Sequence, residues 1–222
     1  MPLVQISGQL VYFAHVPKCA GTAIEWWLRD AFGQLAFYDP QFFTLPPAER
    51  WTRSSPQHMD RQAFERLFPR GFCDAVFTVV RHPVPRLISA FRFQRDVEET
   101  VSPDILFEDW LHRIETNRSE AFWDYDNHNR PMDDLVPEGA TVFRLENGLE
   151  AVRAWVQDLV GPDHPALPEI APRNMMTARL KHLGKDDTPV IPTAAAIDQI
   201  AQRYHRDFAR FGYTPHDWSA CG

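Results

Sequence analysis

Cysteines, long apolar runs and metal-binding motifs are what this sequence has least of. Its three cysteines cannot form a disulfide framework, and they include no C-x-x-C pair. Its nine histidines include no H-E-x-x-H motif, so we expect no metal site. No stretch approaches the roughly 20 apolar residues of a membrane span, and the N-terminus lacks the basic-then-apolar pattern of a signal peptide. We therefore expect no transmembrane segment.

The sequence also lacks an excess of positive charge. Its 23 Lys and Arg residues against 30 Asp and Glu residues give a formal charge of −7. A protein that binds nucleic acid usually presents a basic surface, so we expect no nucleic-acid partner. The length of 222 residues and the hydrophobic content of 44% are ordinary for one globular unit. We predict a single domain over residues 1–222, in which an anionic ligand needs local clusters of positive charge.

The first such cluster follows an apolar, β-branched and aromatic run at residues 11–16, which stops at Pro17 and Lys18. The next apolar residues recur at helical spacing, namely Ile24, Trp27, Leu28 and Ala31. A strand, a tight loop and a helix N-terminus form an anion cradle, because loop amides and the first helical N–H groups converge on one oxyanion. Lys18 adds an ammonium, while Ala20 and Gly21 let the backbone approach closely.

Two other kinds of phosphate loop do not fit this stretch. A Walker A loop places its lysine directly after the last glycine, whereas Lys18 precedes Gly21 by three residues. A cysteine-phosphatase loop requires arginine six residues after the cysteine, and the residue six after Cys19 is Glu25. Cys19 itself is either a thiol of lowered pKa, since it lies at a helix N-terminus beside Lys18, or a small loop residue.

A second strand, loop and helix follow further along the chain. Residues 74–80 indicate a buried strand, and Pro83 and Pro85 after it suit the start of a helix. Arg81 lies at the carboxyl end of the strand, where open α/β sheets bind ligands. Ser89 lies two turns into the helix, where it could share a phosphate with Arg81.

These motifs resemble those of a known family. The sequence PKCAGT at Pro17–Thr22 resembles the 5′-phosphosulfate loop of sulfotransferases. The pattern R-x-P-x-x-R-x-x-S-x-F at Arg81–Phe91 is similar to the 3′-phosphate motif of the same family. Later segments resemble the carbohydrate sulfotransferases, the Golgi membrane-associated branch, at residues 127–131, 141–147 and 204–213. The resemblance covers about residues 10–214.

The resemblance implies an α/β fold that is P-loop-like and three-layered, with a central, mainly parallel sheet flanked by helices. It implies 3′-phosphoadenosine 5′-phosphosulfate as the sulfuryl donor, adenosine 3′,5′-bisphosphate as the product, and no metal. The acceptor is expected to be a hydroxyl group of a small molecule or glycan. Animal members of this branch are usually anchored in the Golgi, and this sequence shows no such anchor. A soluble, cytoplasmic and bacterial member is therefore expected.

The donor site of the family corresponds to two groups of residues here. The 5′ end is expected to bind Pro17, Lys18, Cys19, Ala20, Gly21, Thr22 and Ala23, and the 3′-phosphate to bind Arg81 and Ser89. Ala23 stands where many members carry a hydroxyl residue, and Met132 replaces a common glutamine. Lys18 is expected to stabilise the bridging oxygen as the S–O bond breaks, because such transfers depend on positioning and electrostatics. Four residues either fold over the adenosine or form a solvated basic loop, namely Arg173, Asn174, Arg179 and Lys181.

The acceptor must lose a proton, so a general base is expected. His58 lies between the two phosphate motifs, and a histidine in the corresponding position is the base in the resembling glycan sulfotransferases. The alternative for His58 is a helix-capping or surface role. His128 is a second candidate base, and with Arg130 it is expected to contact the acceptor. Glu25 is a third candidate for the base or an acceptor contact, unless it is a capping partner of Thr22.

Further helices are predicted from their ends: one opened by Ser102 and Pro103, one capped by Asn147 and Glu150 and ended by Gly161, and one over about 193–211. Residues 34–57 and 162–192 carry no clear pattern and are candidates for lids or substrate loops. Two other functions remain open. A non-catalytic nucleotide-binding or scaffold protein gains support if His58 is remote from Lys18. A P-loop-like kinase needs Mg²⁺ ligands and a Walker A loop, which the sequence does not contain.

Overall fold

The computed structural model describes residues 2–116, 125–173 and 175–218. Within these residues the strands form one sheet in the order β1-β2-β3-β4. β1 pairs with β2 in antiparallel fashion, whereas β2, β3 and β4 run parallel. The strands are β1 Leu3–Ile6, β2 Gln9–Ala14, β3 Ala75–Val80 and β4 Thr141–Arg144. The predicted α/β fold with a mainly parallel sheet is confirmed.

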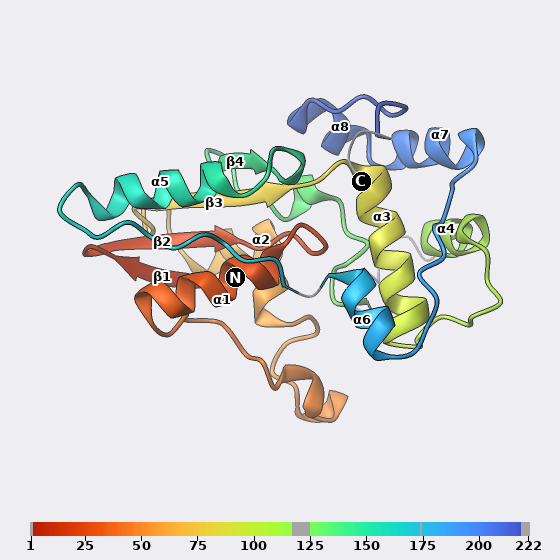
Figure 1. The fold of residues 1–222 in the computed structure, drawn as a ribbon, viewed down its shortest axis with the longest axis horizontal. Coiled ribbons are helices and arrows are strands. Elements are labelled where there is room, and N and C mark those ends of the chain that lie inside the picture. Colours follow the sequence, from red (N-terminus) through yellow and green to blue (C-terminus); the bar gives the residue numbers. More distant parts are fainter. Residues whose placement is uncertain (1, 117–124, 174, 219–222) are drawn as a thin grey trace.

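Helices cover both faces of this sheet (Figure 1). Phe13 of β2 and Phe77 of β3 stack with ring centroids 4.9 Å apart, and they share an apolar core with α1 and α5. Tyr12 points to the opposite face, where its ring stacks on Phe64 of α2 at 4.2 Å. Neighbouring residues of one strand are thus buried on opposite faces. These helices are α1 Gly21–Phe32, α2 Arg61–Leu67 and α5 Glu150–Val160.

A second apolar core lies beyond the carboxyl ends of β2 and β3 (Figure 1). His82 caps the helix that follows β3 by accepting a hydrogen bond from the Val84 amide, and Pro83 occupies its first turn as predicted. This helix continues directly into a π-helix at Phe93–Val97. The helices of the second core are α3 Pro83–Arg92, α4 Phe107–Thr116, α7 Ala194–Arg203 and α8 His205–Phe211.

Two predicted helix starts are wrong. α4 begins at Phe107 instead of Ser102, because the Ser102 hydroxyl accepts a hydrogen bond from an amide two residues later and forms a local turn. α5 begins after Leu149 with no side-chain cap, so the predicted cap by Asn147 is absent. The predicted end of α5 at Gly161 is confirmed, since that glycine has a φ of 87° and its amide closes the last turn.

The predicted last helix is interrupted at Tyr204, which separates α7 from α8. The Tyr204 hydroxyl donates a hydrogen bond to the carbonyl of Asn129 at 2.8 Å. A buried tyrosine hydroxyl needs such a partner, and the bond fixes this point of the chain against the 125–130 loop. The apolar stripe predicted over 193–211 is buried on both sides of the interruption.

Segments without a predicted pattern contain short elements. β1 forms a hairpin with β2 through Ser7 and Gly8, whose φ angles of 47° and 83° suit a tight two-residue turn. Residues 34–57 contain short 3-10 turns, and α6 (Met176–His182) lies within 162–192. Among the described residues, no helix combines the length and the apolar character needed to cross a membrane. The cytoplasmic location stays a prediction.

Candidate active site

The loop between β2 and α1 has the backbone of an anion-binding turn. Lys18 and Ala20 adopt left-handed φ angles of 67° and 62°. Alternation of left-handed and right-handed residues turns successive N–H groups toward one point, which is the geometry of an anion nest. α1 then begins without a side-chain cap, so no side chain of its own occupies the helix N-terminus, where anions bind. Thr22 is half-buried and Ala23 buried in this first turn.

Gly21 serves a purpose that the sequence did not predict. A Cβ at this position would lie 1.8 Å from Nε2 of His15. The His15 ring therefore lies directly against the first residue of α1, and any side chain at position 21 would collide with it. The φ of Gly21 is not in the left-handed region, so packing and not backbone conformation requires the glycine.

The Lys18 side chain lies on an aromatic ring. Its Nζ is 3.8 Å from the ring centroid of Phe93, and the guanidinium of Arg179 lies 5.0 Å from the same centroid. Burial lowers the pKa of Lys18 to about 7; the nearby Glu98 opposes this shift, and the charges of Arg179 and Arg81 add to it. Two cations thus lie on one ring and a third, Arg81, acts on Lys18, and such an excess of positive charge favours a bound anion.

Cys19 is a small loop residue in this structure. The side chain is buried, and its Sγ lies 3.6 Å from the carbonyl oxygen of Pro17. Burial raises the pKa of the Cys19 thiol to about 12, although the charges of Arg86 and Arg81 oppose this shift. The thiol is therefore protonated at neutral pH, and the alternative of a reactive thiolate is wrong.

Arg86 joins the loop between β2 and α1, residues 15–20, to a distant segment; this loop is called the phosphate loop below, after the ligand that the sequence predicts for it. Arg86 is fully buried on α3, and its Nε donates to the carbonyl of Pro17 at 3.2 Å. Its Nη2 donates to the carbonyls of His128 and Arg130 at 3.1 and 2.8 Å. One guanidinium fixes the loop that precedes Lys18 relative to the 125–130 loop.

Arg81 and Ser89 occupy the positions that the second motif predicts. Arg81 follows the last residue of β3, and its charge acts on both Lys18 and Cys19. Ser89 is half-buried in the second turn of α3. Both thus lie on the element that leaves the carboxyl end of β3, which is where α/β sheets bind ligands.

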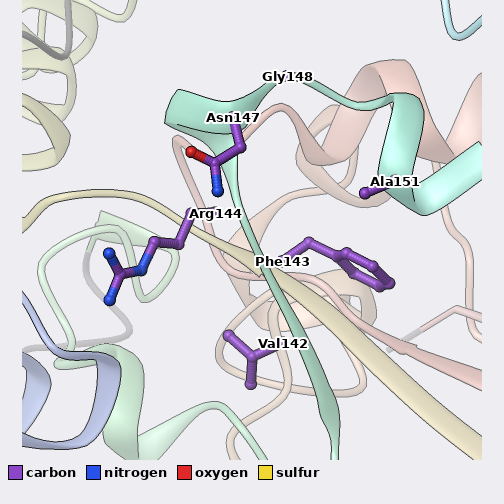
Figure 2. Close-up of a pocket in the computed structure, with 6 residues that line it drawn as sticks. All are labelled: Val142, Phe143, Arg144, Asn147, Gly148 and Ala151. Atoms are coloured by element: carbon purple, nitrogen blue, oxygen red, sulfur yellow. The ribbon is translucent and has the colours of Figure 1, made fainter.

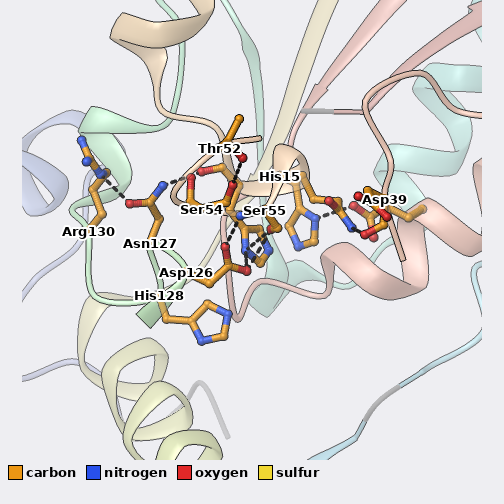
Figure 3. A network of polar contacts seen from close by, with 12 residues as sticks. His15, Asp39, Thr52, Ser54, Ser55, Asp126, Asn127, His128 and Arg130 are labelled. Carbon is orange, nitrogen blue, oxygen red and sulfur yellow. Dashed lines mark hydrogen bonds and ion pairs between the residues drawn. The ribbon is translucent and has the colours of Figure 1, made fainter. Parts of the chain in front are cut away.

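His58 is paired with a carboxylate that the sequence did not single out. It ends a 3-10 turn at Pro56–His58, and its Nδ1 lies 2.6 Å from Oδ2 of Asp126. Figure 3 shows Asp126 beside Ser55 in this polar network. Ser55 donates to the same carboxylate through its amide at 2.6 Å and its hydroxyl at 2.9 Å. Asn127 Nδ2 donates to the His58 carbonyl at 2.7 Å. Asp126 thus binds the His58 ring through Nδ1, and Asn127 binds the His58 backbone. Neither of these two contacts uses Nε2 of the ring.

These contacts favour the deprotonated, negatively charged form of Asp126. Burial acts to raise the pKa of Asp126, but the charge and hydrogen bond of His58 outweigh it and lower the pKa to about 2. Asp126 is therefore a carboxylate at neutral pH. Its Oδ2 can accept a hydrogen bond from Nδ1–H of His58, the tautomer in which Nε2 carries no proton.

Three histidines meet around this pair. The His58 ring lies 4.5 Å from that of His15 and 5.3 Å from that of His128, measured between centroids. The ring of His128 also contacts Phe93 at 5.4 Å. Burial, together with the charges of Lys18 and His58, lowers the pKa of His128 well below 6.5, so this histidine is neutral. His128 thus lies between the His58 pair and the Lys18–Phe93 contact.

The remaining candidates take up different places. Glu25 is buried, and its Oε1 lies 2.6 Å from Nδ1 of His15. It does not cap α1, so the interpretation of Glu25 as a capping partner of Thr22 is wrong. Arg130 donates to Asn127 Oδ1 at 3.0 Å, which places it beside the same loop.

Within the described residues, His58, Asp126 and His128 offer metal-donor atoms within 4.8 Å of one another. The carboxylate of Asp126 is already bound by three donors, from Ser55 and His58. The positive charges of Lys18 and Arg86 act on His128. Because nearby cations oppose the binding of another cation, the cluster is built as a hydrogen-bonded imidazole and carboxylate.

One hollow lies beside α5 and another beside α6. One, of about 250 Å³, lies where β4 gives way to α5, and Phe143 and Arg144 project to opposite sides of the strand beside it (Figure 2). The other, of about 420 Å³, lies between the π-helix and α6 and is lined in part by Val97 and Arg179. Of the other residues predicted either to cover the adenosine or to form a solvated loop, Arg173 lies over the Trp26 ring, with its guanidinium carbon 4.6 Å from the ring centroid. Lys181 is exposed on α6, and Asn174 lies outside the described residues.

The comparison with protein families covers all of these elements. A sequence model described as the sulfotransferase family matches residues 7–214, which includes both phosphate loops, His58 and Asp126. No curated protein and no solved structure matches the sequence. The extent of the match agrees with the fold and with the loop between β2 and α1. The chain belongs to the sulfotransferase family.

Proposed function

We propose that this sulfotransferase moves a sulfuryl group from 3′-phosphoadenosine 5′-phosphosulfate to a hydroxyl group of a carbohydrate or related acceptor. The observation that carries the proposal is that the anion loop and the His58–Asp126 pair meet at His128. His128 lies 5.3 Å from the ring of His58, and the charge of Lys18 acts on it. Glu98 is likewise affected by both Lys18 and His58. A cation for the leaving group and a base for the acceptor therefore share one neighbourhood.

Lys18 and the loop amides act on the leaving group. As the acceptor oxygen bonds to sulfur, the bond from sulfur to the bridging oxygen breaks and its electron pair moves to the 5′-phosphate of the departing nucleotide. The ammonium of Lys18 and the N–H groups that begin α1 stabilise this charge. Arg81 and Ser89 hold the 3′-phosphate at the start of α3, and this second anchor fixes the register of the donor.

His58 acts on the acceptor. Its Nδ1 is committed to Asp126, so its Nε2 takes the proton of the acceptor hydroxyl as the new S–O bond forms. Asp126 stabilises the imidazolium that results. His128 and Arg130 contact the acceptor beside it, and the hollow between the π-helix and α6 offers room for the body of that molecule. Such a site suits an acceptor larger than the reacting hydroxyl alone.

The proposal is tested by transfer of radiolabelled sulfuryl groups from the donor to a panel of carbohydrate and small-alcohol acceptors. Wild-type protein is expected to label at least one acceptor. Lys18→Ala and His58→Ala are expected to lower turnover by at least 10²-fold each, the scale of one lost oxyanion donor or general base. His58→Ala is expected to keep the affinity for adenosine 3′,5′-bisphosphate within a few-fold. The exposed His205→Ala serves as the matched control and is expected to remain fully active.

The outcomes distinguish the alternatives. Binding of the bisphosphate without transfer to any acceptor favours a non-catalytic nucleotide-binding protein. Stabilisation by ATP with Mg²⁺ but not by the bisphosphate favours a kinase, and a ligand at 100 times its dissociation constant stabilises by about 2.7 kcal/mol. Full activity of His58→Ala assigns the base to another residue.

A further inference from the structure

Glu25 and His15 form a buried pair that the reaction described above does not use. His15 follows the last residue of β2, and Glu25 lies in the second turn of α1. Nδ1 of His15 and Oε1 of Glu25 are 2.6 Å apart, and both side chains are more than nine-tenths buried. The pair joins the two ends of the phosphate loop, because residue 15 enters the loop and residue 25 belongs to the helix that leaves it. A single hydrogen bond thus closes the loop on itself.

The His15 ring also fixes the start of α1. It fills the space where a Cβ of residue 21 would lie, with Nε2 only 1.8 Å from that point. On its other side it stacks on Phe13 with an interplanar angle of 15°. The ring therefore has one position, set by Phe13, Gly21 and Glu25. Rigid support of this kind is what a loop that binds a transition state requires.

The same ring touches His58. The two ring centroids are 4.5 Å apart at an interplanar angle of 83°, an edge-to-face contact. Burial lowers the pKa of His15, so its ring is neutral and Nδ1–H donates to Glu25. Burial acts to raise the pKa of Glu25, but His15 outweighs it and lowers that pKa. The pair therefore carries one negative charge behind His58.

We propose that Glu25, through His15, is a positioning residue that holds the phosphate loop and the general base in register and stabilises the protonated base. The proposal rests on the proposed function. When His58 takes the acceptor proton, the imidazolium gains two anionic neighbours, Asp126 directly and Glu25 through the His15 ring. One buried carboxylate, that of Glu25, then affects two features of the site. It supports the shape of the phosphate loop, and it influences the basicity of His58.

The titration of His58 reports on this arrangement. The groups near it on the surrounding elements are Asp126 and His128 from the 125–130 loop, His15 from the phosphate loop, Glu25 from α1 and Glu98 after the π-helix. The charge of Lys18 acts on two of these groups, His128 and Glu98. Glu25→Gln keeps the shape of the side chain and removes one negative charge from this set. Loss of an anion disfavours the imidazolium, so the midpoint of the His58 titration falls.

The test is an NMR titration of the His58 ring in the ligand-free protein, with pH profiles of kcat alongside. In Glu25→Gln we expect the His58 midpoint to fall by roughly 0.5 to 1 pH unit. The acidic limb of kcat should move to lower pH by the same amount, with kcat about tenfold lower. Glu25→Asp keeps the negative charge, so its His58 midpoint is expected to lie close to that of the wild-type protein. Glu150→Gln removes a carboxylate from the exposed start of α5, is the matched control, and is expected to leave both midpoints unchanged.

A His58 midpoint that moves no further in Glu25→Gln than in Glu150→Gln overturns the proposal. If Glu25→Gln does not fold, the wild-type protein decides, because the His15 ring signals should shift at the His58 midpoint and their constancy contradicts the coupling. The two NMR measurements, the His58 midpoint and the His15 ring signals, need no substrate. A wild-type protein that labels no acceptor therefore contradicts the proposed function alone, while the titration still decides the role of Glu25.

Discussion

The Lys18 ammonium lies on the face of the Phe93 ring, where burial disfavours its protonated form. Burial lowers the pKa of Lys18 to about 7, so this ammonium gives up its proton far more readily than that of an exposed lysine. The cation–π contact with Phe93 stabilises the protonated form, while Arg179 and Arg81 oppose it. A bound phosphate reverses this balance, because it adds negative charge where cations repel one another.

We predict that binding of adenosine 3′,5′-bisphosphate takes up a proton. The ligand favours the ammonium form of Lys18, so affinity is highest below pH 7 and weakens up to tenfold per unit above it. Calorimetry at pH 8 in buffers of different ionisation enthalpy should show a net uptake of up to one proton per nucleotide, because the free Lys18 is largely deprotonated above its pKa of about 7. Lys18→Met should lose this uptake. Equal uptake in the two proteins would show that another group titrates.

Single residues differ in how far the sequence could predict them. Lys18, Arg81 and His58 lie in or beside local patterns of strand, loop and helix, and such patterns can be found within a dozen residues. Asp126 carries no local signal, since its partner His58 is 68 positions away. Only the folded chain brings the two together. The His15–Glu25 pair was missed for a different reason, because the glycine between them indicated a close approach of ligand and not of a ring.

At the scale of elements, α3 carries more than its sequence indicated. Its N-terminus follows Arg81, its second turn presents Ser89, and its buried Arg86 binds three carbonyls of two other segments. The carbonyls of Pro17, His128 and Arg130 are buried or half-buried and have this guanidinium as a partner. The helix thus orders the phosphate loop and the 125–130 loop together.

Replacement of Arg86 by Met is expected to lower the free energy of unfolding by roughly 3 kcal/mol, because buried carbonyls lose a charged donor. Arg86→Lys should recover only part of this, since an ammonium cannot reproduce the planar fork. Urea denaturation measures the loss, and nucleotide affinity should fall in parallel. The exposed Arg113→Met on α4 is the control. A loss no larger than in that control would mean that Arg86 does not hold the loops.

The helices that were misplaced share a physical cause. Serine and asparagine cap helices, but they also bond to neighbouring amides in local turns, as Ser102 does here, and the sequence does not decide between these outcomes. The interruption at Tyr204 depends on a hydrogen bond to Asn129, a contact across 75 positions. Apolar spacing predicts that residues share a buried face. It does not predict that the axis changes direction within that face.

At the scale of the whole molecule, acid should weaken the fold through the Asp126 carboxylate. The pKa of Asp126 is about 2 in the folded protein and near 3.8 when unfolded, so its contribution is present above pH 4 and is lost as pH falls toward 2. Between pH 5 and pH 2 the difference in unfolding free energy between wild type and Asp126→Asn should shrink by about 2 kcal/mol. Denaturant melts at several pH values measure this difference. A constant difference would contradict the paired carboxylate.

The architecture was more accessible from the sequence than the site. Two stretches of strand, loop and helix predicted the parallel strands β2 and β3, because apolar runs that end at proline or arginine are local signals. β1 was missed because its four residues and the Ser7–Gly8 turn are too short to form a clear alternation. The His58–Asp126 and Arg86 contacts join segments that are distant in sequence, and only the packed sheet and α3 set their geometry.

The contact between His15 and Gly21 has a consequence for sequence variation in the family. Alanine or serine at position 21 needs the space that the imidazole of His15 occupies, so the two positions cannot vary independently. Relatives that carry a side chain at the position of Gly21 should carry something other than histidine at the position of His15. Such relatives must also lack the His15–Glu25 bond, and they should therefore be free to replace the acid. The absence of a side chain at Gly21 thus links the amino acids that can occur at positions 15, 21 and 25.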